Sequence, residues 1–150
     1  MALHVTHETL RMSRFIEASV PEVWQANADT SVRSQWAVPA GEGLVYQFDD
    51  FRTGGRATYL CGPADNLQFY ANVEYLLVER LNVVVYVETL RSQEQLLSTG
   101  ILTWRFDEAP NGMNVMVTNQ LTSFVGHDMI DGNRNGHRIA LEQLATLLAS

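Results

Sequence analysis

The sequence predicts an α+β protein in which an antiparallel sheet of six to seven strands packs against one long C-terminal helix. Between residues 44 and 121, apolar and polar residues alternate in successive segments, which is the pattern of half-buried strands. Short turn motifs separate these segments and favour consecutive hairpins, so the sheet is expected to be antiparallel with one buried face. Over residues 126–150 the apolar residues instead recur at steps of three and four, as on one face of an amphipathic helix.

Before residue 44 the chain is expected to form one strand and two short helices. Residues 6–18 combine β-formers with charged residues and are interpreted as the first strand. Residues 19–22 (SVPE) supply a capping serine, a first-turn proline and a glutamate at the capping-box position, so a helix begins there. Asp29 or Thr30 then caps a second short helix, which ends at Trp36.

Six further strands are predicted from the alternating pattern, over residues 44–49, 56–61, 69–77, 83–87, 100–106 and 113–121. The Pro-Asn-Gly motif at residues 110–112 is a strong signal for a hairpin turn between the last two. In the first of the six, the alternation places Tyr46 and Phe48 on one face, and in the third it places Tyr75 and Leu77 together. A sheet of this size needs a large covering element, and only the terminal helix is long enough.

One face of the terminal helix changes character along its length. This face holds Ile130, Arg134, His137, Leu141, Leu144 and Leu148. Its leucines are typical of a core, whereas Arg134 and His137 stand where further leucines would be expected, which predicts a lid over a partly polar cavity. Two alternatives stay open: Arg134 lies along the core edge and reaches water, and His137 is a hydrogen-bonded core histidine. Gly136, at the flank of this face, is expected to let the helix approach the sheet closely because it lacks a Cβ.

Length, charge and cysteine content narrow the class of protein. A chain of 150 residues is one domain by size and can bury a core without disulfides. The net charge of −7 argues against a nucleic-acid partner or an anionic membrane, because both require a basic patch. Cys61 is the only cysteine, and neither a signal peptide nor an apolar stretch of spanning length occurs, so we expect a cytoplasmic protein without membrane insertion. Whether an edge strand pairs into a homodimer stays open.

Several short motifs follow one another in a recognisable order: residues 14–24 (RFIEASVPEVW), 34–36 (SQW), 51–56 (FRTGGR), 75–81 (YLLVERL) and 135–137 (NGH). In this order the chain resembles the START-like superfamily, also called SRPBCC or helix-grip, in the branch similar to the C-terminal domain of the heat-shock-protein 90 ATPase activator and to polyketide cyclases. The resemblance implies a single domain over residues 1–150, with a curved sheet and the long helix packed across it. His137 departs from the tryptophan or threonine that relatives often carry after the helix glycine, so different pocket chemistry is expected.

The inward side chains of the predicted sheet form a wall of aromatic rings with polar tips, a composition typical of ligand pockets. The predicted ligand-binding residues are Trp36, Tyr46, Tyr59, Tyr75, Trp104, Asn119, Arg134 and His137. Arg134 could hold a carboxylate through two hydrogen bonds, and His137 could donate or accept a proton. The competing interpretation is a solid aromatic core whose hydroxyl groups reach water at the rim.

Three functions are compatible with these residues. The leading hypothesis is a protein that binds a small hydrophobic or amphipathic molecule, of unknown identity, between the sheet and the terminal helix. The second is an enzyme of the cyclase or dehydratase kind with His137 as general acid or base, although no nucleophile with an adjacent base is visible. The third, implied only by the resemblance and ranked last, is a chaperone-interacting module. No cofactor is expected, and no metal site, since His4 and His7 have no further ligands beside them.

Overall fold

The computed structural model of the protein describes residues 4–93 and 95–149. The strands are β1 (Thr6–Ile16), β2 (Glu42–Asp49), β3 (Arg56–Pro63), β4 (Phe69–Glu79), β5 (Val83–Ser92), β6 (Gln95–Ala109) and β7 (Gly112–Ser123). The helices are α1 (Val20–Ala28), α2 (Thr30–Trp36) and α3 (His127–Leu148). The expected terminal helix therefore begins one residue after Gly126, and Ser150 lies outside the described residues.

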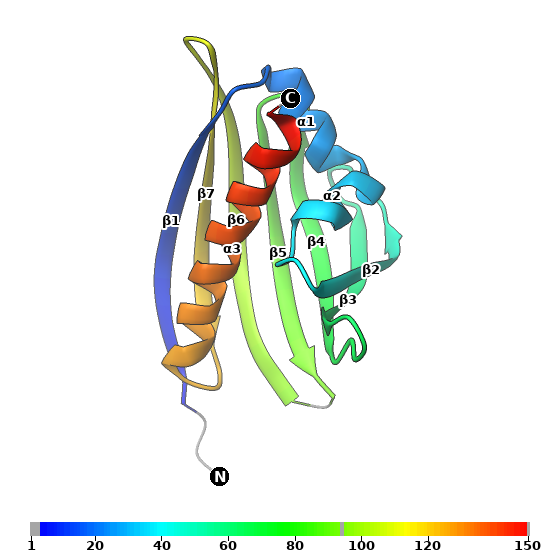
Figure 1. Cartoon of the computed structure of the whole chain (residues 1–150). Coiled ribbons are helices and arrows are strands. Elements are labelled where there is room, and N and C mark those ends of the chain that lie inside the picture. The colour runs from blue at the N-terminus through cyan, green and yellow to red at the C-terminus, as the bar shows by residue number, and fades with distance from the viewer. Residues whose placement is uncertain (1–3, 94, 150) are drawn as a thin grey trace.

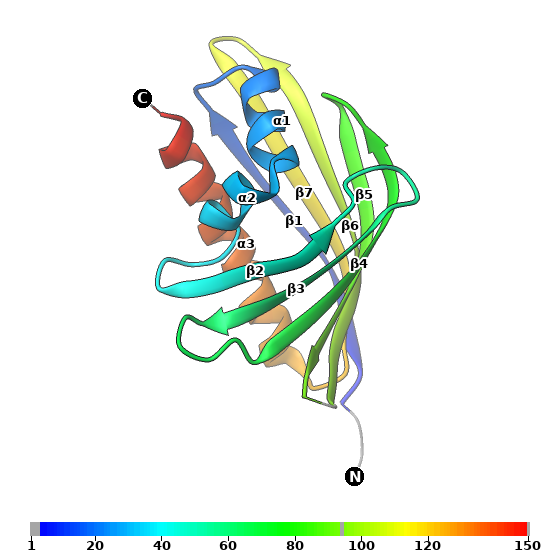
Figure 2. The same ribbon diagram turned by 90° about the vertical axis from the view of Figure 1, so that its right-hand side faces the viewer.

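All seven strands join one antiparallel sheet in the order β1-β7-β6-β5-β4-β3-β2. The sheet curves, and α3 lies across its concave side while α1 and α2 cover the same side nearer β2 (Figures 1 and 2). The α+β class and the helix-grip arrangement are thereby confirmed. In this order the first strand, β1, lies beside the last strand, β7, and β1 and β2 form the two edges of the sheet.

The predicted helix starts are confirmed in detail. Ser19 accepts a hydrogen bond from the backbone of Glu22, and the Glu22 side chain accepts one from the backbone N–H of Ser19, which completes a capping box. Asp29 Oδ1 accepts from the backbone of Ser31 and Val32 at the start of α2. The two short helices are thus separated by a single residue, which keeps them folded together over one end of the sheet.

Two β-bulges overturn part of the predicted alternation. In β2 the pairing with β3 skips Gln47, so Phe48 turns to the outer face and is half exposed, whereas Asp49 turns inward. In β4 the pairing with β5 skips Leu76, so Leu77 also faces outward. The prediction that Phe48 and Leu77 share a face with Tyr46 and Tyr75 is therefore wrong, because one extra residue reverses every side chain beyond it.

The helix α3 is held on the sheet by two separate groups of buried apolar side chains. Near its start, Ile130 packs with Leu10 of β1 and Leu121 of β7. In its second half, Leu141 and Leu144 join the main core. About ten residues of helix, roughly 15 Å, separate these anchors. The residues between them are where unfilled space can occur.

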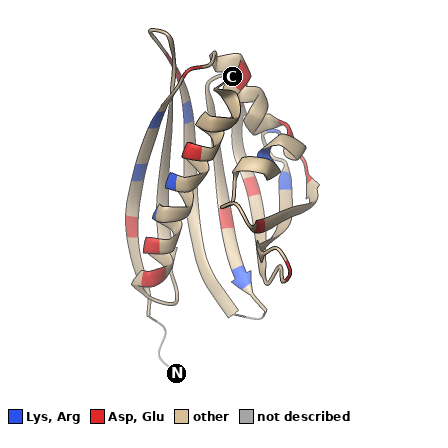
Figure 3. Ribbon diagram, in the orientation of Figure 1, with Lys and Arg blue, Asp and Glu red and all other residues tan. Residues whose placement is uncertain are grey.

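Charged side chains lie mainly on the outside of this arrangement. Acidic and basic residues are interspersed along β1 and α3 (Figure 3), where Arg14 pairs with Glu142 at 2.8 Å and Arg134 pairs with Glu8 at 3.0 Å. Within the described residues, no helix combines the length and the apolar composition that a bilayer crossing requires.

Candidate functional site

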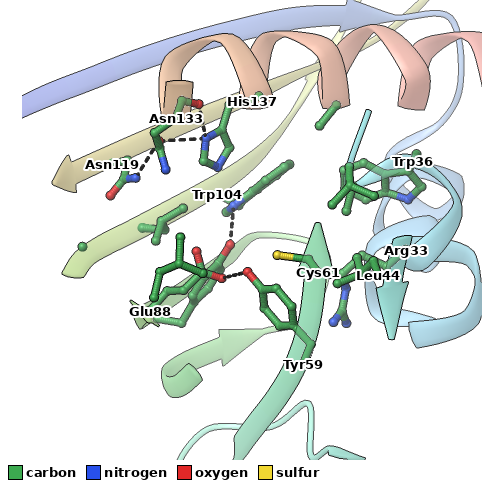
Figure 4. A pocket seen from close by; sticks show the side chains of 18 of the residues that line it. Arg33, Trp36, Leu44, Tyr59, Cys61, Glu88, Trp104, Asn119, Asn133 and His137 are labelled. Atoms are coloured by element: carbon green, nitrogen blue, oxygen red, sulfur yellow. Dashed lines mark hydrogen bonds between the residues drawn. The ribbon is translucent and has the colours of Figure 1, made fainter. Parts of the chain in front are cut away.

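A cavity of about 250 Å³ lies between the concave face of the sheet and α3, in the stretch between the two anchors. Its walls come from β2, β3, β5, β6 and β7, from α3, and from the end of α2 with the loop that follows it. Much of the wall is apolar, with Leu44, Leu90, Leu102, Leu121 and Ala140 among the lining residues. The remaining surface is aromatic and polar (Figure 4).

Six of the eight predicted ligand-binding residues line this cavity, namely Trp36, Tyr46, Tyr59, Trp104, Asn119 and His137. They come from four strands and two helices and are brought together by the curvature of the sheet. Tyr75 and Arg134 do not line it. The structure thus brings six of the eight side chains together around one cavity, while their part in binding stays a prediction.

Arg134 points away from the cavity, so its predicted placement is wrong. Its side chain is 45% exposed, and its guanidinium donates to Glu8 Oε1 on β1 at 3.0 Å and to Asp131 Oδ1 on its own helix at 3.1 Å. The position lies at the edge of the buried helix face, and a flexible arginine there keeps its charge hydrated. Turning inward would remove that hydration and both carboxylate partners, so the outward orientation is favoured.

Tyr75 belongs to a buried polar cluster beside the cavity. Arg33 Nη1 lies 2.8 Å from Asp49 Oδ2, and the two side chains are only 8% and 2% exposed. Tyr75 donates to Asp49 Oδ1 at 2.7 Å, and Thr30 donates to Asp49 Oδ2 at 2.8 Å. Arg33 also donates to Tyr46 Oη at 3.0 Å. This cluster joins α2 to β2 and β4, and Tyr75 lines a separate, much smaller cavity of about 30 Å³.

His137 extends from α3 toward the cavity (Figure 4), and its hydrogen bonds define its tautomer. Nδ1 lies 3.1 Å from both the backbone oxygen and Oδ1 of Asn133, and both oxygens accept hydrogen bonds. Nδ1 therefore carries the proton, which leaves Nε2 as an acceptor. Burial lowers the pKa of His137, with partial opposition from the Asn133 carbonyl, so the neutral ring is favoured near pH 7.

Glu88 lies on β5 across the cavity from His137 (Figure 4). Tyr59 donates to its Oε1 at 2.5 Å. Burial raises the pKa of Glu88, and the Tyr59 hydrogen bond only partly offsets this effect. Sequence reasoning missed Glu88 because the predicted strand stopped at Val87. Continuing the alternation from Tyr86 to Glu88 and Leu90, which all line the cavity, would have found it.

The two glycines of the cavity wall play opposite roles. A Cβ added at Gly136 would meet no atom within 4 Å, so the expected close approach of helix and sheet at this position is wrong. At Gly100 of β6, by contrast, a Cβ would overlap Asn119 Oδ1. Gly100 therefore makes room for the Asn119 side chain, whose Nδ2 donates to Asn133 Oδ1 at 3.0 Å. This bond links β7 to the residue that orients His137.

The cysteine and the potential metal ligands of the described residues also bear on function. Cys61 lines the cavity, but burial, strengthened by the nearby Glu88 charge, raises the pKa of its thiol to about 12. A thiol of that pKa is protonated at neutral pH and is a poor nucleophile. No group of three or more potential metal ligands comes together in residues 4–93 and 95–149.

The loop between α2 and β2 is fastened to α3 by one side chain. Gln143 Nε2 donates to the backbone oxygens of Trp36 at 2.9 Å and Val38 at 2.7 Å, and its Oε1 accepts from the backbone of Ala40 at 3.0 Å. Ala37, Val38 and Pro39 of this loop form part of the cavity wall. Gln143 therefore determines how firmly that wall is closed against the helix.

A curved antiparallel sheet that grips a C-terminal helix defines the START-like, or SRPBCC, superfamily. The sequence profile of one of its families, described as "Activator of Hsp90 ATPase homolog 1-like protein", matches residues 17–149, and the chain belongs to that family. A search of curated proteins found no match.

Solved structures share the fold over nearly the whole chain. An uncharacterized protein from Rhizobium leguminosarum is 22% identical, with 99% of this chain and 98% of that chain covered and a TM-score of 0.84. Protein Mll3558 from Rhizobium loti is 25% identical, with 95% and 97% covered and a TM-score of 0.83. DynU16, a protein of the dynemicin biosynthetic locus, is 16% identical, with 95% of this chain and 47% of that chain covered and a TM-score of 0.70.

Proposed function

We propose that this protein binds a small, mostly apolar molecule in the cavity between its curved sheet and α3. The observation that carries the proposal is the unfilled space of about 250 Å³ under α3, between two well-packed anchors. Pockets of this kind combine an apolar and aromatic wall with a few placed polar groups. The volume is slightly below the usual range for ligand pockets, about 300–1,000 Å³, so the ligand is the size of one or two rings.

Unsatisfied polar atoms support the same proposal. Arg33 Nη2 and Asn119 Oδ1 are buried and have no hydrogen-bond partner among the described residues. Both side chains line the cavity, but the two atoms themselves are covered, so a ligand would supply the missing partners only where these side chains turn toward it. Buried polar atoms without partners are rare because each one is costly, and they are often found where a protein binds something else.

The first experiment asks whether a molecule is retained. The protein is purified from its own host and analysed by native mass spectrometry. We expect a mass shift that disappears on denaturation. The second experiment adds 4-phenylbutan-1-ol, a neutral probe, and follows tryptophan fluorescence, since Trp36 and Trp104 both line the cavity.

A matched pair of variants tests the location. Gly136→Leu places a side chain at the cavity wall where an added Cβ has free space, and we expect it to reduce probe binding at least tenfold. Gly132→Leu makes the same change one turn earlier on α3, at an exposed position with free space, and should leave binding unchanged. Equal affinity of the two variants would refute the location, and no retained molecule together with no probe binding would refute the proposal.

One observation favours catalysis in the same cavity as a second candidate function. The neutral His137 ring has an available Nε2 acceptor, and Glu88 faces it from the other side with a raised pKa, so the cavity holds a base and an acid. An enzyme of the cyclase or dehydratase kind would lose its rate in His137→Gln. Its rate would also fall as the pH drops through a pKa below the ordinary histidine value. A rate that does not change in His137→Gln would exclude this role.

A further inference from the structure

Glu88 is the only carboxylate residue that lines the main cavity within the described part of the chain. Its group sits on the concave side of the central strand β5, and the one hydrogen bond recorded for it comes from Tyr59 to Oε1. The second carboxyl oxygen, Oε2, has no partner among the described residues. A carboxyl group in this setting can still accept a strong hydrogen bond from whatever enters the cavity.

No cation of the described chain neutralises Glu88. The ten basic residues of the sequence are all arginines, and none of the described ion pairs includes Glu88. The one arginine on the cavity wall is Arg33, which is already paired with Asp49 at 2.8 Å. The Arg33–Asp49 pair is neutral as a unit, so the uncompensated charge of the cavity is the negative charge of ionised Glu88.

Aromatic rings surround the same part of the cavity. Tyr59 and Tyr46 lie with ring centroids 5.2 Å apart, and both line the wall with Tyr86 and Trp104. Trp104 Nε1 donates to Tyr86 Oη at 3.1 Å, and Tyr86 precedes Glu88 by two residues on β5, where both line the cavity. The faces of such rings attract cations, and a carboxylate among several aromatic rings is a common way to bind an ammonium group.

We propose that the ligand of this cavity carries a protonated amine, which is seated against the Glu88 carboxylate among the surrounding tyrosine and tryptophan rings. The proposal rests on the proposed function and names the chemical class of its ligand. The apolar wall under α3 then holds the hydrocarbon body of the amine. His137 Nε2 is an acceptor, so the polar group opposite Glu88 also suits a ligand that donates hydrogen bonds.

A carboxylate ligand is the main competitor, because Arg33 Nη2 has no partner and could donate to it. Such an anion would lie near both Asp49, which already holds Arg33, and Glu88. Like charges in a poorly hydrated cavity repel strongly. A neutral alcohol fits the cavity but gains no ion pair. The order of affinity expected for one hydrocarbon body is therefore amine, then alcohol, then acid.

The pH dependence has a defined sign. An ammonium group needs ionised Glu88, and burial raises the pKa of Glu88, so amine affinity should increase as the pH rises from about 5 to about 8. Protonation of His137 at low pH would add a competing positive charge and acts in the same direction. The other titratable groups facing the cavity do not change charge in this interval because they are arginine, a thiol or phenols with raised pKa: Arg33, Tyr46, Tyr59, Cys61 and Tyr86.

The experiment measures dissociation constants by isothermal titration calorimetry for three probes with one hydrocarbon body, 4-phenylbutan-1-amine, 4-phenylbutan-1-ol and 4-phenylbutanoate. At about pH 8 we expect the amine to bind at least tenfold more tightly than the alcohol, and the acid more weakly than either. Glu88→Gln keeps the size of the side chain and an acceptor for Tyr59, so it should fold normally. It should abolish the preference for the amine while alcohol affinity changes less than threefold.

The control variant is Glu74→Gln on β4, an exposed residue outside the main cavity, which should keep the wild-type order. Alcohol binding without any preference for the amine, or an amine preference that survives in Glu88→Gln, would overturn the amine assignment and leave the proposed function standing. Tighter binding of the acid than of the alcohol would overturn it as well. Failure of all three probes to bind would overturn both proposals together.

Discussion

The buried ion pair between Arg33 and Asp49 provides a direct test of what holds α2 on the sheet. Asp49→Asn preserves the shape of the side chain but keeps only one acceptor oxygen, so it loses one of the bonds from Tyr75 and Thr30, which use different carboxylate oxygens, and it leaves the Arg33 charge uncompensated. The two side chains are 8% and 2% exposed, so water cannot replace the lost partner. Removing one member of a buried pair typically costs about 3–5 kcal/mol.

The neighbouring residue offers a matched control. Asp50 forms an ion pair with Arg52 at 2.9 Å, nearly the same length as the buried pair, but these side chains are 47% and 67% exposed. Asp50→Asn should cost about 0–1 kcal/mol, because solvent screens the pair. Each variant removes one negative charge, and the two positions are adjacent. The difference between their unfolding free energies therefore reports the effect of burial and not of net charge.

The assay is equilibrium unfolding in urea, with thermal melting as a second measure. For a protein of this length, about 3–5 kcal/mol corresponds to a fall in Tm of roughly 6–20 °C. The double variant Arg33→Met with Asp49→Leu removes both charges and should regain most of the loss, since an apolar pair can replace a buried ion pair. If Asp49→Asn unfolds no more easily than Asp50→Asn, burial does not govern this pair and the reasoning is refuted.

Three further predictions follow from the cavity wall and its surroundings. In urea unfolding, Gly136→Ala should stabilise the protein by up to about 1 kcal/mol, because alanine has the higher helix propensity and meets no clash there. Gly100→Ala should destabilise it by about 1–3 kcal/mol, because the added methyl group would overlap Asn119. A lower unfolding free energy for Gly136→Ala than for Gly100→Ala would contradict the placement of both glycines. Gln143→Ala removes three hydrogen bonds to the α2–β2 loop and should cost about 1–2 kcal/mol, with faster hydrogen exchange at the Ala40 amide as the local sign; unchanged exchange would show that the loop is held elsewhere. Burial raises the pKa of Glu88 in the folded protein, so the stabilising contribution of the protonated carboxyl group is lost as the pH rises from the ordinary glutamate range through that pKa. Glu88→Gln should therefore be more stable than the wild type near pH 8, and the difference should vanish toward about pH 4. A difference that does not depend on pH would argue against this burial effect.

The fold could be predicted from the sequence because its signals are local. The capping box at Ser19 and Glu22 depends on residues three apart, and both hydrogen bonds formed as expected. The Pro-Asn-Gly turn works in the same way, with Asn111 in the left-handed conformation at φ 66° between β6 and β7. Periodicity then indicated which long segment covers the sheet, since a single amphipathic helix was available.

The site was predicted only in part because no local sequence pattern marks a β-bulge or the direction in which a flexible side chain points. No residue type marks Gln47 as a bulge, yet that bulge turns Asp49 inward to meet Arg33 and turns Phe48 out. The helical spacing placed Arg134 and His137 on one face, but a long arginine at the edge of that face can point either into the cavity or into solvent. The hydrogen bond to Glu8 on β1 stabilises the outward orientation. Glu88 was missed for a simpler reason, since the strand was ended too early.

The cavity itself is specified by side chains that are small or polar where a core would be filled. Along α3 the leucine pattern gives way at Asn133, Gly136 and His137, and the facing strand β6 carries Gly100. At about 24 cal/mol for each Å³ of empty volume, a dry space of about 250 Å³ would cost about 6 kcal/mol, which is comparable to the whole stability of a typical domain. Polar residues reduce this cost by allowing water in when no ligand is bound. Gly136→Leu should therefore raise stability and weaken probe binding together, and a variant that did only one of these would show that the space and the binding site are not the same.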